Sequence, residues 1–185
     1  MTDEREIRWG LIQVFTGDGK GKTTAALGTA LRAAALGKKC AIIYFDKGGE
    51  SHYSERIILR NKVPEIEIYP TGLDRIDSTG KFRFGVTDED RAEGKRGLQI
   101  LKDLIAKEAY DLIVLDEINP STHLGIIDED SVLGMISERS SKTELILTGR
   151  NAPQSFLELA DLVTEMGLKK HYFYQGVKAR EGLDY

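Results

Sequence analysis

Residues 16–24 read Thr-Gly-Asp-Gly-Lys-Gly-Lys-Thr-Thr, a glycine-rich stretch with Gly-Lys-Thr near its end. An apolar run at residues 11–15 precedes it and is typical of a buried strand, and an alanine- and leucine-rich segment at residues 25–36 follows and is typical of a helix. A strand, a glycine-rich turn, Gly-Lys-Thr and a helix in this order match the phosphate-binding P-loop motif. The sequence therefore predicts a nucleotide-binding site in a P-loop type of α/β fold.

The residue types of this stretch suit the binding of a polyphosphate. Its glycines permit a tight turn that points backbone N–H groups into one concavity, and a helix beginning near Lys22 adds the positive end of its dipole. Lys22 and Lys20 carry ammonium groups for the phosphates, and the Thr23 hydroxyl is a potential Mg²⁺ ligand. The residues expected to contact the nucleotide are Gly17, Asp18, Gly19, Lys20, Gly21, Lys22, Thr23 and Thr24.

One position departs from the usual motif. A glycine, four further residues and then Gly-Lys-Ser or Gly-Lys-Thr would require a glycine at position 16, where this chain has Thr16. The departure counts against a standard kinase or GTPase arrangement of the loop and leaves another use of the polyphosphate open.

Composition sets the broad class of the protein. The 185 residues are 41% hydrophobic and 30% charged, which suits one globular domain spanning residues 1–185. The formal net charge of −4 offers no basic field for nucleic acid. Cys40 is the only cysteine and is expected to be buried, which excludes an intrachain disulfide. No apolar run reaches membrane-spanning length, so we expect a cytoplasmic protein without a signal peptide or anchor.

Strand and helix patterns alternate along the rest of the chain. Apolar runs predict strands at residues 40–45, 65–69, 112–115, 144–148 and 162–166. Periodic segments predict helices at residues 54–61, 88–109, 129–139 and 153–160, with Thr87 as the N-cap of the longest. This alternation predicts an α/β fold: a doubly wound, mostly parallel sheet of about six strands with helices on both faces. Residues 70–86 lack periodicity and are expected to form an active-site loop, and residues 167–185 form a C-terminal tail.

Polar residues follow several strands, at the sheet edge where parallel sheets bind ligands. Asp116 and Glu117 follow the strand at 112–115; one carboxylate can hold Mg²⁺, and the second can ligate it or act as a base. Arg150 follows another strand and suits either a phosphate contact or a surface ion pair. Residues 46–49 form a further polar rim. The histidines show no metal-ligand spacing and are interpreted as surface or structural residues; they are His52, His123 and His171.

Several segments together resemble one family. They are the loop at residues 16–26, the pair Asp116-Glu117 after Leu115, the strand end at 147–150, the segment 158–165 and the ending at 176–185, Gly-Val-Lys-Ala-Arg-Glu-Gly-Leu-Asp-Tyr. This set closely resembles the P-loop type of ATP:corrinoid adenosyltransferase, which makes adenosylcobalamin and its precursors. The likeness spans nearly the whole chain, and the ending is its most specific part because P-loops are widespread.

The resemblance implies a transferase that moves the 5′-deoxyadenosyl group of ATP onto Co(I) of a corrinoid and releases triphosphate. By that likeness Lys22 neutralises the triphosphate, Thr23 and Glu117 hold Mg²⁺ or Mn²⁺, and Asp116 shares the metal or lies behind it. Lys22 and Glu117 are then the catalytic candidates, acting by placement and electrostatics rather than by acid–base chemistry. The likeness also implies a homodimer and a flavoprotein reductant as partners.

The corrinoid half of the site departs from the family pattern. Members commonly show Gly-Phe-Thr-Trp at the start of the long helix, whereas this chain has Gly-Val-Thr-Asp at residues 85–88. Phe82, Phe84 and Val86 are the candidate replacements for the two missing aromatic side chains, although ordinary loop anchoring explains the phenylalanines equally well.

Two other functional classes stay open at this point. A P-loop ATPase or small-molecule kinase would use Glu117 as a base and cleave at the γ-phosphate. A non-catalytic module would bind the nucleotide and a corrinoid without turnover. The product distinguishes them: intact triphosphate for the transferase, orthophosphate or a phosphorylated acceptor for the kinase class, and neither for the module.

Overall fold

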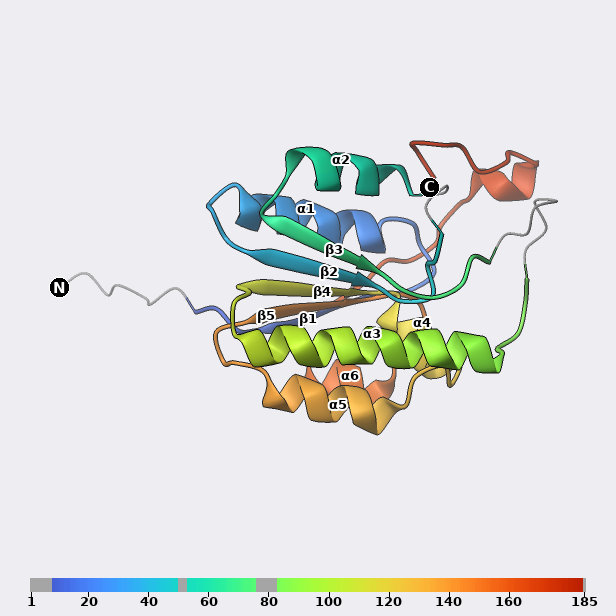
Figure 1. Ribbon diagram of the computed structural model, residues 1–185. Coiled ribbons are helices and arrows are strands. Elements are labelled where there is room, and N and C mark those ends of the chain that lie inside the picture. The colour runs from blue at the N-terminus through green and yellow to red at the C-terminus, as the bar shows by residue number, and fades with distance from the viewer. Residues whose placement is uncertain (1–7, 50–52, 76–82, 185) are drawn as a thin grey trace.

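The computed structural model describes residues 8–49, 53–75 and 83–184, which form a sheet between two layers of helices (Figure 1). Two residues considered above, His52 and Phe82, lie outside the described residues, as does the middle of the predicted active-site loop at 70–86. The described ends of that loop, residues 70–75 and 83–86, lie at the carboxyl edge of the sheet.

A six-stranded sheet forms the middle layer, and every neighbouring pair of its strands is parallel. The strand order is β3-β2-β4-β5-β1-β6. The strands are β1 (Ile12–Thr16), β2 (Cys40–Tyr44), β3 (Ile66–Pro70), β4 (Leu112–Asp116), β5 (Glu144–Thr148) and β6 (Leu162–Glu165). Strands β2, β4 and β5 are buried along their whole length, because helices cover both of their faces. The predicted doubly wound, parallel α/β fold is confirmed.

Helices cover the two faces of the sheet unequally (Figure 1). One face carries α1 (Lys22–Ala34) and α2 (Ser54–Lys62), and the other carries α3 (Asp88–Lys107), α5 (Glu129–Glu138) and α6 (Gln154–Leu159). Small side chains such as Ala26 and Ala30 face the sheet from α1, which allows that helix a close approach. The opposite core is built from larger side chains, among them Leu101, Leu104 and Phe156. Cys40 is buried in the first of these cores, as predicted.

Two short elements were not predicted. Helix α4 (Ile118–His123) begins directly after the acidic end of β4, and a 3₁₀ helix spans Tyr172–Gln175 in the C-terminal tail. Pro120 lies in the first turn of α4, where proline is tolerated. Proline is also typical of turns, so the sequence pattern alone does not indicate a helix here. Glu117 precedes this helix with φ 60°, in the left-handed region, so the chain turns sharply between β4 and α4.

A capping box fixes the start of α3 next to the described end of the 70–86 loop. The Thr87 hydroxyl accepts a hydrogen bond from the Asp90 backbone N–H at 3.3 Å, and the Asp90 carboxylate accepts one from the Thr87 backbone N–H at 2.8 Å. The predicted N-cap is therefore confirmed. Arg83 donates two hydrogen bonds to the same Asp90 carboxylate, which ties the loop to the helix.

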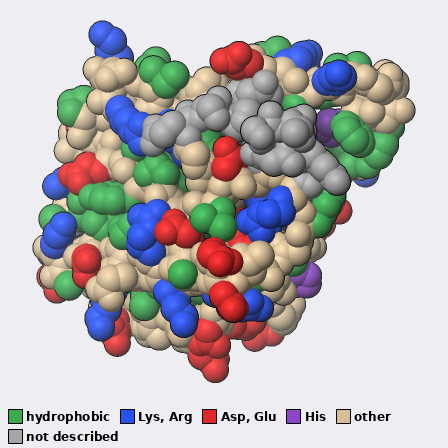
Figure 2. Space-filling model, turned by 45° about the vertical axis from the view of Figure 1, so that its right-hand side comes forward, with side chains coloured by type: hydrophobic (Ala, Val, Ile, Leu, Met, Phe, Trp, Pro, Cys, Tyr) green, Lys and Arg blue, Asp and Glu red, His purple; other side chains and the backbone are tan. Residues whose placement is uncertain are grey.

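No described helix combines the length and the apolar character that crossing a membrane requires. On the face drawn in Figure 2, basic and acidic side chains are interspersed rather than gathered into a field of one sign. A local cluster of charged side chains lies at the carboxyl edge of the sheet, where Lys47 contacts Asp116 and Glu117.

Replacement of Thr87 by alanine tests the capping box. We expect Thr87→Ala to lower the free energy of unfolding by about 1 kcal/mol, because the Asp90 backbone N–H loses its acceptor. Thr87→Ser keeps a hydroxyl and should stay near wild type. Urea unfolding followed by circular dichroism measures both, and equal stability of all three proteins would show that the cap contributes nothing.

Candidate active site

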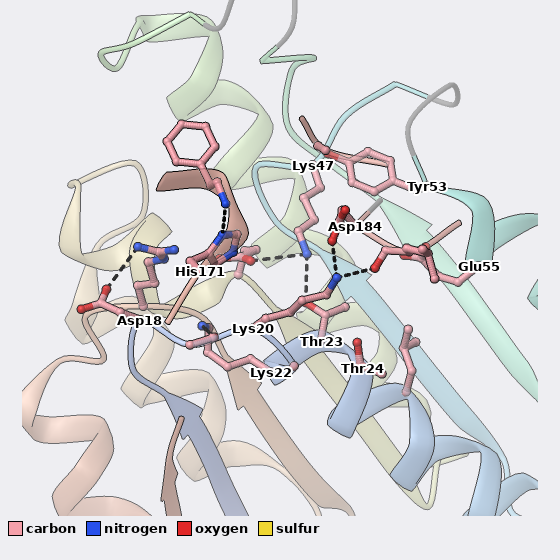
Figure 3. A pocket seen from close by; sticks show the side chains of 18 of the residues that line it. Asp18, Lys20, Lys22, Thr23, Thr24, Lys47, Tyr53, Glu55, His171 and Asp184 are labelled. Atoms are coloured by element: carbon pink, nitrogen blue, oxygen red, sulfur yellow. Dashed lines mark hydrogen bonds and ion pairs between the residues drawn. The ribbon is translucent and has the colours of Figure 1, made fainter. Parts of the chain in front are cut away.

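The carboxyl ends of the central strands open into a cavity of about 660 Å³ (Figure 3). Its walls come from the glycine-rich loop, the segments after β2, β4 and β5, and the C-terminal tail. The predicted site residues that line it are Asp18, Gly19, Lys20, Gly21, Lys22, Thr23, Thr24, Glu117 and Arg150. Gly17 and Asp116 do not line the cavity themselves but accept hydrogen bonds from residues that do. The Gly17 carbonyl accepts from Lys22, and the Asp116 carboxylate accepts from Lys47. Sequence motifs and cavity therefore coincide.

Glycines are required in the loop because another backbone segment packs against it. The Gly19 N–H donates to the Met166 carbonyl at 2.6 Å, just after β6. A Cβ atom at Gly19 would lie 2.7 Å from that oxygen and 2.9 Å from the Gly167 carbonyl oxygen, closer than real Cβ contacts. Gly21, the N-cap of α1, has φ 118°, a conformation that favours glycine. The loop is thus shaped by backbone contacts before any ligand binds.

Lys22 lies folded into this loop. Its ammonium donates to the Gly17 carbonyl at 2.7 Å and to the Gly19 carbonyl at 2.8 Å, and only 8% of the residue is exposed. Burial lowers the pKa of Lys22, and the charge of Glu117 partly opposes that effect. A charge held among carbonyl oxygens at low exposure is poised for a stronger anionic partner such as a phosphate.

The acidic pair predicted after β4 is oriented by Thr148 at the end of β5. The Thr148 hydroxyl donates to Asp116 Oδ1 at 2.6 Å and accepts from the Glu117 backbone N–H at 3.1 Å. The Asp116 side chain is only 1% exposed and that of Glu117 is 26% exposed. Burial raises the pKa of Glu117, while the neighbouring Lys47 opposes the rise.

Lys47 completes this cluster. Its ammonium lies 2.5 Å from Asp116 Oδ2 and 3.4 Å from Glu117 Oε1. It also lies 3.1 Å from the hydroxyl of Thr23 (Figure 3). Burial acts against the charge, but the Asp116 and Glu117 carboxylates outweigh it and raise the pKa of Lys47. The lysine is therefore a firmly charged cation between the loop and the acidic pair.

Sequence reasoning placed Lys47 on a polar rim and gave it no role. The available signal was topological: β2 and β4 are neighbours, and Tyr44 at the end of β2 pairs with Asp116 at the end of β4. A lysine three residues beyond Tyr44 reaches the carboxylate of the adjacent strand. The strand order that brings them together could not be read from the local pattern.

The donor set fits a hard divalent cation. The described residues contain no group of three or more His, Cys, Asp or Glu side chains able to hold a metal. One hydroxyl and two carboxylates nevertheless converge on a single cation, the ammonium of Lys47. Oxygen ligands of this kind suit Mg²⁺, which usually takes one or two carboxylates and completes its shell with phosphates and water.

Arg150 lies on the rim of the cavity, as expected, and pairs there with another predicted residue. Its guanidinium is 3.2 Å from the Asp18 carboxylate across the glycine-rich loop, and both side chains are largely exposed. Arg150 therefore forms a surface ion pair and also lines the cavity. Its contact with a phosphate stays a prediction. An exposed pair of this kind contributes little stability.

Comparisons with known proteins agree with this geometry. A family model described as ATP:corrinoid adenosyltransferase BtuR/CobO/CobP matches residues 8–185. The chain is 37% identical over 183 residues to Corrinoid adenosyltransferase from Escherichia coli strain K12, covering 99% of this chain and 87% of that protein. It is 35% identical over 176 residues to Corrinoid adenosyltransferase CobA from Salmonella typhimurium, covering 95% and 86%.

The chain belongs to the ATP:corrinoid adenosyltransferase family. Its activity is the ATP-dependent transfer of an adenosyl group to a corrinoid. A third relative, Corrinoid adenosyltransferase from Sinorhizobium sp, is 36% identical over 187 residues, with 100% of this chain and 82% of that protein covered. The resemblance inferred from the loop, the acidic pair and the chain ending is confirmed.

The C-terminal tail of this adenosyltransferase folds over the glycine-rich loop. Lys20, which lines the cavity and was predicted to face a phosphate, contacts the Asp184 carboxylate, the Leu183 carbonyl at 2.5 Å and the Tyr172 hydroxyl at 3.3 Å. Asp184 also accepts hydrogen bonds from Tyr172 and from Arg180. The hydrogen bonds from these donors, of which that from Lys20 has the largest effect, hold the pKa of Asp184 below its usual range. The family-specific ending therefore forms one wall of the cavity.

The histidines differ in their surroundings. His171 lines the cavity, and its Nδ1 accepts a hydrogen bond from the Phe173 backbone N–H at 3.0 Å, so it caps the 3₁₀ helix of the tail (Figure 3). His123 is exposed at the end of α4. Both agree with the predicted structural or surface roles, although the place of His171 in the cavity wall was not foreseen.

Of the residues proposed for the corrinoid, the two that the structure describes, Phe84 and Val86, do not line the cavity. Phe84 is 85% exposed, and Val86 packs against the core beneath α3. The described part of their loop is held by Arg75, which donates to the Asp46 carboxylate and to the Gly85 carbonyl. Their contribution to corrinoid binding stays a prediction, while the cavity itself presents Phe173, Val177 and Leu183 from the tail.

Replacement of Asp184 by asparagine tests whether the tail is held by charge. We expect Asp184→Asn to weaken the contacts with Lys20 and Arg180 and to speed tryptic cleavage after the basic residues of the tail. Glu181→Gln removes the same charge from an exposed neighbouring side chain and should digest like wild type. Mass spectrometry of the fragments measures both rates; equal rates in the three proteins would argue that Asp184 does not fasten the tail.

Proposed function

We propose that this adenosyltransferase holds the triphosphate of ATP on the glycine-rich loop and presents the 5′ carbon of the ribose to a reduced corrinoid. Lys22 would leave the Gly17 and Gly19 carbonyls for the phosphates, and the backbone N–H groups of the loop and the start of α1 would add neutral donors. Arg150 at the rim would contribute a further positive charge. The open cavity leaves room for the adenosyl group.

The step would be a displacement at carbon. Co(I) of the corrinoid donates an electron pair to C5′, the cobalt–carbon bond forms, and the C5′–O bond breaks as triphosphate leaves with its electron pair. Cobalt passes formally from Co(I) to Co(III), and no proton changes place. The work of the protein is therefore to position ATP and to stabilise the leaving group, which needs fixed positive charges rather than an acid or base.

Thr23, Glu117 and Asp116 would hold Mg²⁺ or Mn²⁺, which when bound supplies further neutralisation of the triphosphate. The observation that carries the whole proposal is the convergence of the Thr23 hydroxyl and the two carboxylates on one cation beside Lys22. In the alternative class, a P-loop ATPase or small-molecule kinase, Glu117 would instead activate water or a hydroxyl group. A non-catalytic module would bind the same ligands and release no product.

An anaerobic assay distinguishes these possibilities. Purified protein is mixed with Mg-ATP and chemically reduced Co(I) corrinoid, the Co(I) absorption is followed, and the phosphate product is analysed. A light-sensitive alkylcobalt product with one equivalent of intact triphosphate supports the proposal. Orthophosphate with persistent Co(I) would establish a hydrolase or kinase, and unchanged substrates with both cobalamin and cobinamide would favour the binding module.

Replacement of Lys22 by alanine tests the triphosphate site. We expect Lys22→Ala to weaken ATP binding by at least about tenfold, because a charged hydrogen-bond donor is lost, and to abolish turnover. The control is Lys38→Ala. It removes a lysine that pairs with Asp111 at the amino ends of β2 and β4, away from the cavity, and should bind ATP normally. Isothermal titration with ATP measures both, and an unchanged affinity in Lys22→Ala would contradict the proposed role.

Several finer expectations remain predictions. They are the single domain over residues 1–185, the active-site function of residues 70–86, the homodimer, the flavoprotein reductant and the cytoplasmic location. Light scattering measures whether the protein is a homodimer. Coupled reduction of a Co(II) corrinoid tests whether a flavoprotein acts as the reductant. The corrinoid preference is best compared between cobalamin and cobinamide, because the residues at 85–88 depart from the family pattern.

A further inference from the structure

Lys47 occupies the point at which the proposed metal ligands meet. Its ammonium contacts the Thr23 hydroxyl at 3.1 Å (Figure 3). It also contacts Asp116 Oδ2 at 2.5 Å and Glu117 Oε1 at 3.4 Å. A divalent ion held by the same three oxygens would lie about 2 Å from them, so the ion and the ammonium cannot share the position. One must leave for the other to bind.

The acidic pair needs a cation at this place. Asp116 is almost completely buried and Glu117 is mostly buried, so both carboxylates are costly without an opposite charge. Two other lysines line the cavity, but the ammonium of Lys22 is engaged by the Gly17 and Gly19 carbonyls and that of Lys20 by Asp184. Lys47 is the ammonium that contacts both acids in the part of the chain the structure describes.

The backbone of Lys47 is held by hydrogen bonds that do not involve the ammonium. The Lys47 carbonyl accepts from Arg56 at 2.7 Å, and its N–H donates to the Thr71 carbonyl at 3.1 Å. Arg56 is itself buried, with its guanidinium 4.2 Å from the Tyr44 ring centre and 3.9 Å from that of Tyr53. The four-carbon stem of Lys47 lines the open cavity, so the ammonium has space into which it can withdraw.

We propose that Lys47 is a built-in counter-cation, which holds the Asp116–Glu117 pair in the nucleotide-free enzyme and yields the position when the metal arrives with ATP. The inference rests on the proposed function in one respect, the assignment of Thr23, Asp116 and Glu117 as metal ligands. A divalent ion alone must displace the lysine without help, so the free enzyme binds it weakly. A metal–ATP complex brings phosphate charge that offers the displaced ammonium a new partner.

Mn²⁺ binding to the nucleotide-free enzyme tests this competition directly. Free Mn²⁺ is measured by electron paramagnetic resonance during titration of wild type, Lys47→Met and Lys38→Met. Lys47→Met should bind Mn²⁺ at least about tenfold more tightly than wild type, because the carboxylates lose their internal cation. Lys38→Met is the matched control: it removes an equal charge from an ion pair with Asp111, before the start of β4, and should bind as wild type does.

A second substitution tests whether the tighter Mn²⁺ binding of Lys47→Met occurs at the acidic pair. Adding Glu117→Gln to Lys47→Met should abolish the gain, and thermal unfolding verifies that all variants are folded. Equal Mn²⁺ affinity in wild type and Lys47→Met would overturn the inference, as would an equal gain in Lys38→Met, which would reflect net charge alone.

One further titration separates this inference from the proposed function. Glu117→Gln in the presence of ATP should weaken Mn²⁺ binding at the ATP site if the metal assignment is right. That result together with no gain in Lys47→Met would overturn the counter-cation while the metal site stands. Unchanged Mn²⁺ binding in Glu117→Gln with ATP would overturn the metal assignment and the counter-cation together.

Discussion

Two carboxylates at the carboxyl end of β4 impose the strongest constraint on this structure. Asp116 and Glu117 lie where the sheet is buried, so they require a cation and well-placed donors. Lys47 from the neighbouring β2 supplies the charge, and Thr148 from the neighbouring β5 supplies the hydroxyl. The surroundings of the acidic pair therefore depend on the order of the three strands, in which β4 lies between β2 and β5.

The glycine-rich loop obeys a second constraint that is steric rather than electrostatic. Its backbone packs against Met166 and Gly167, which follow β6, the strand beside β1. Gly19 leaves no room there for a side chain, and this close contact keeps the loop open toward the cavity. The turn is thus preorganised for a ligand, because it is held by the segment that follows β6 rather than by the ligand itself.

Local sequence patterns predicted most of the fold and several of the residues that line the cavity. The strands are short apolar runs and α3 begins at a recognisable cap, so each is specified by residues close together in the chain. Lys47 and the contact of Lys20 with Asp184 could not be predicted in the same way. The first depends on the order of strands in the sheet, and the second joins residues 164 positions apart. Such contacts are properties of topology and do not leave a periodic signal.

The two sides of the cavity differ in how firmly they are held. The acidic pair, Lys47 and the glycine-rich loop lie at or just beyond the ends of β1, β2 and β4, strands whose core side chains are buried. The tail packs with Phe173 at 67% and Leu183 at 63% exposure, and its contacts with the loop are mainly the polar bonds of Asp184. Segments with few buried contacts open at the lowest free energy, so the tail is the wall that yields most easily. Any widening of this cavity for a ligand therefore costs least if the tail moves while the glycine-rich loop, packed against the segment after β6, stays in place.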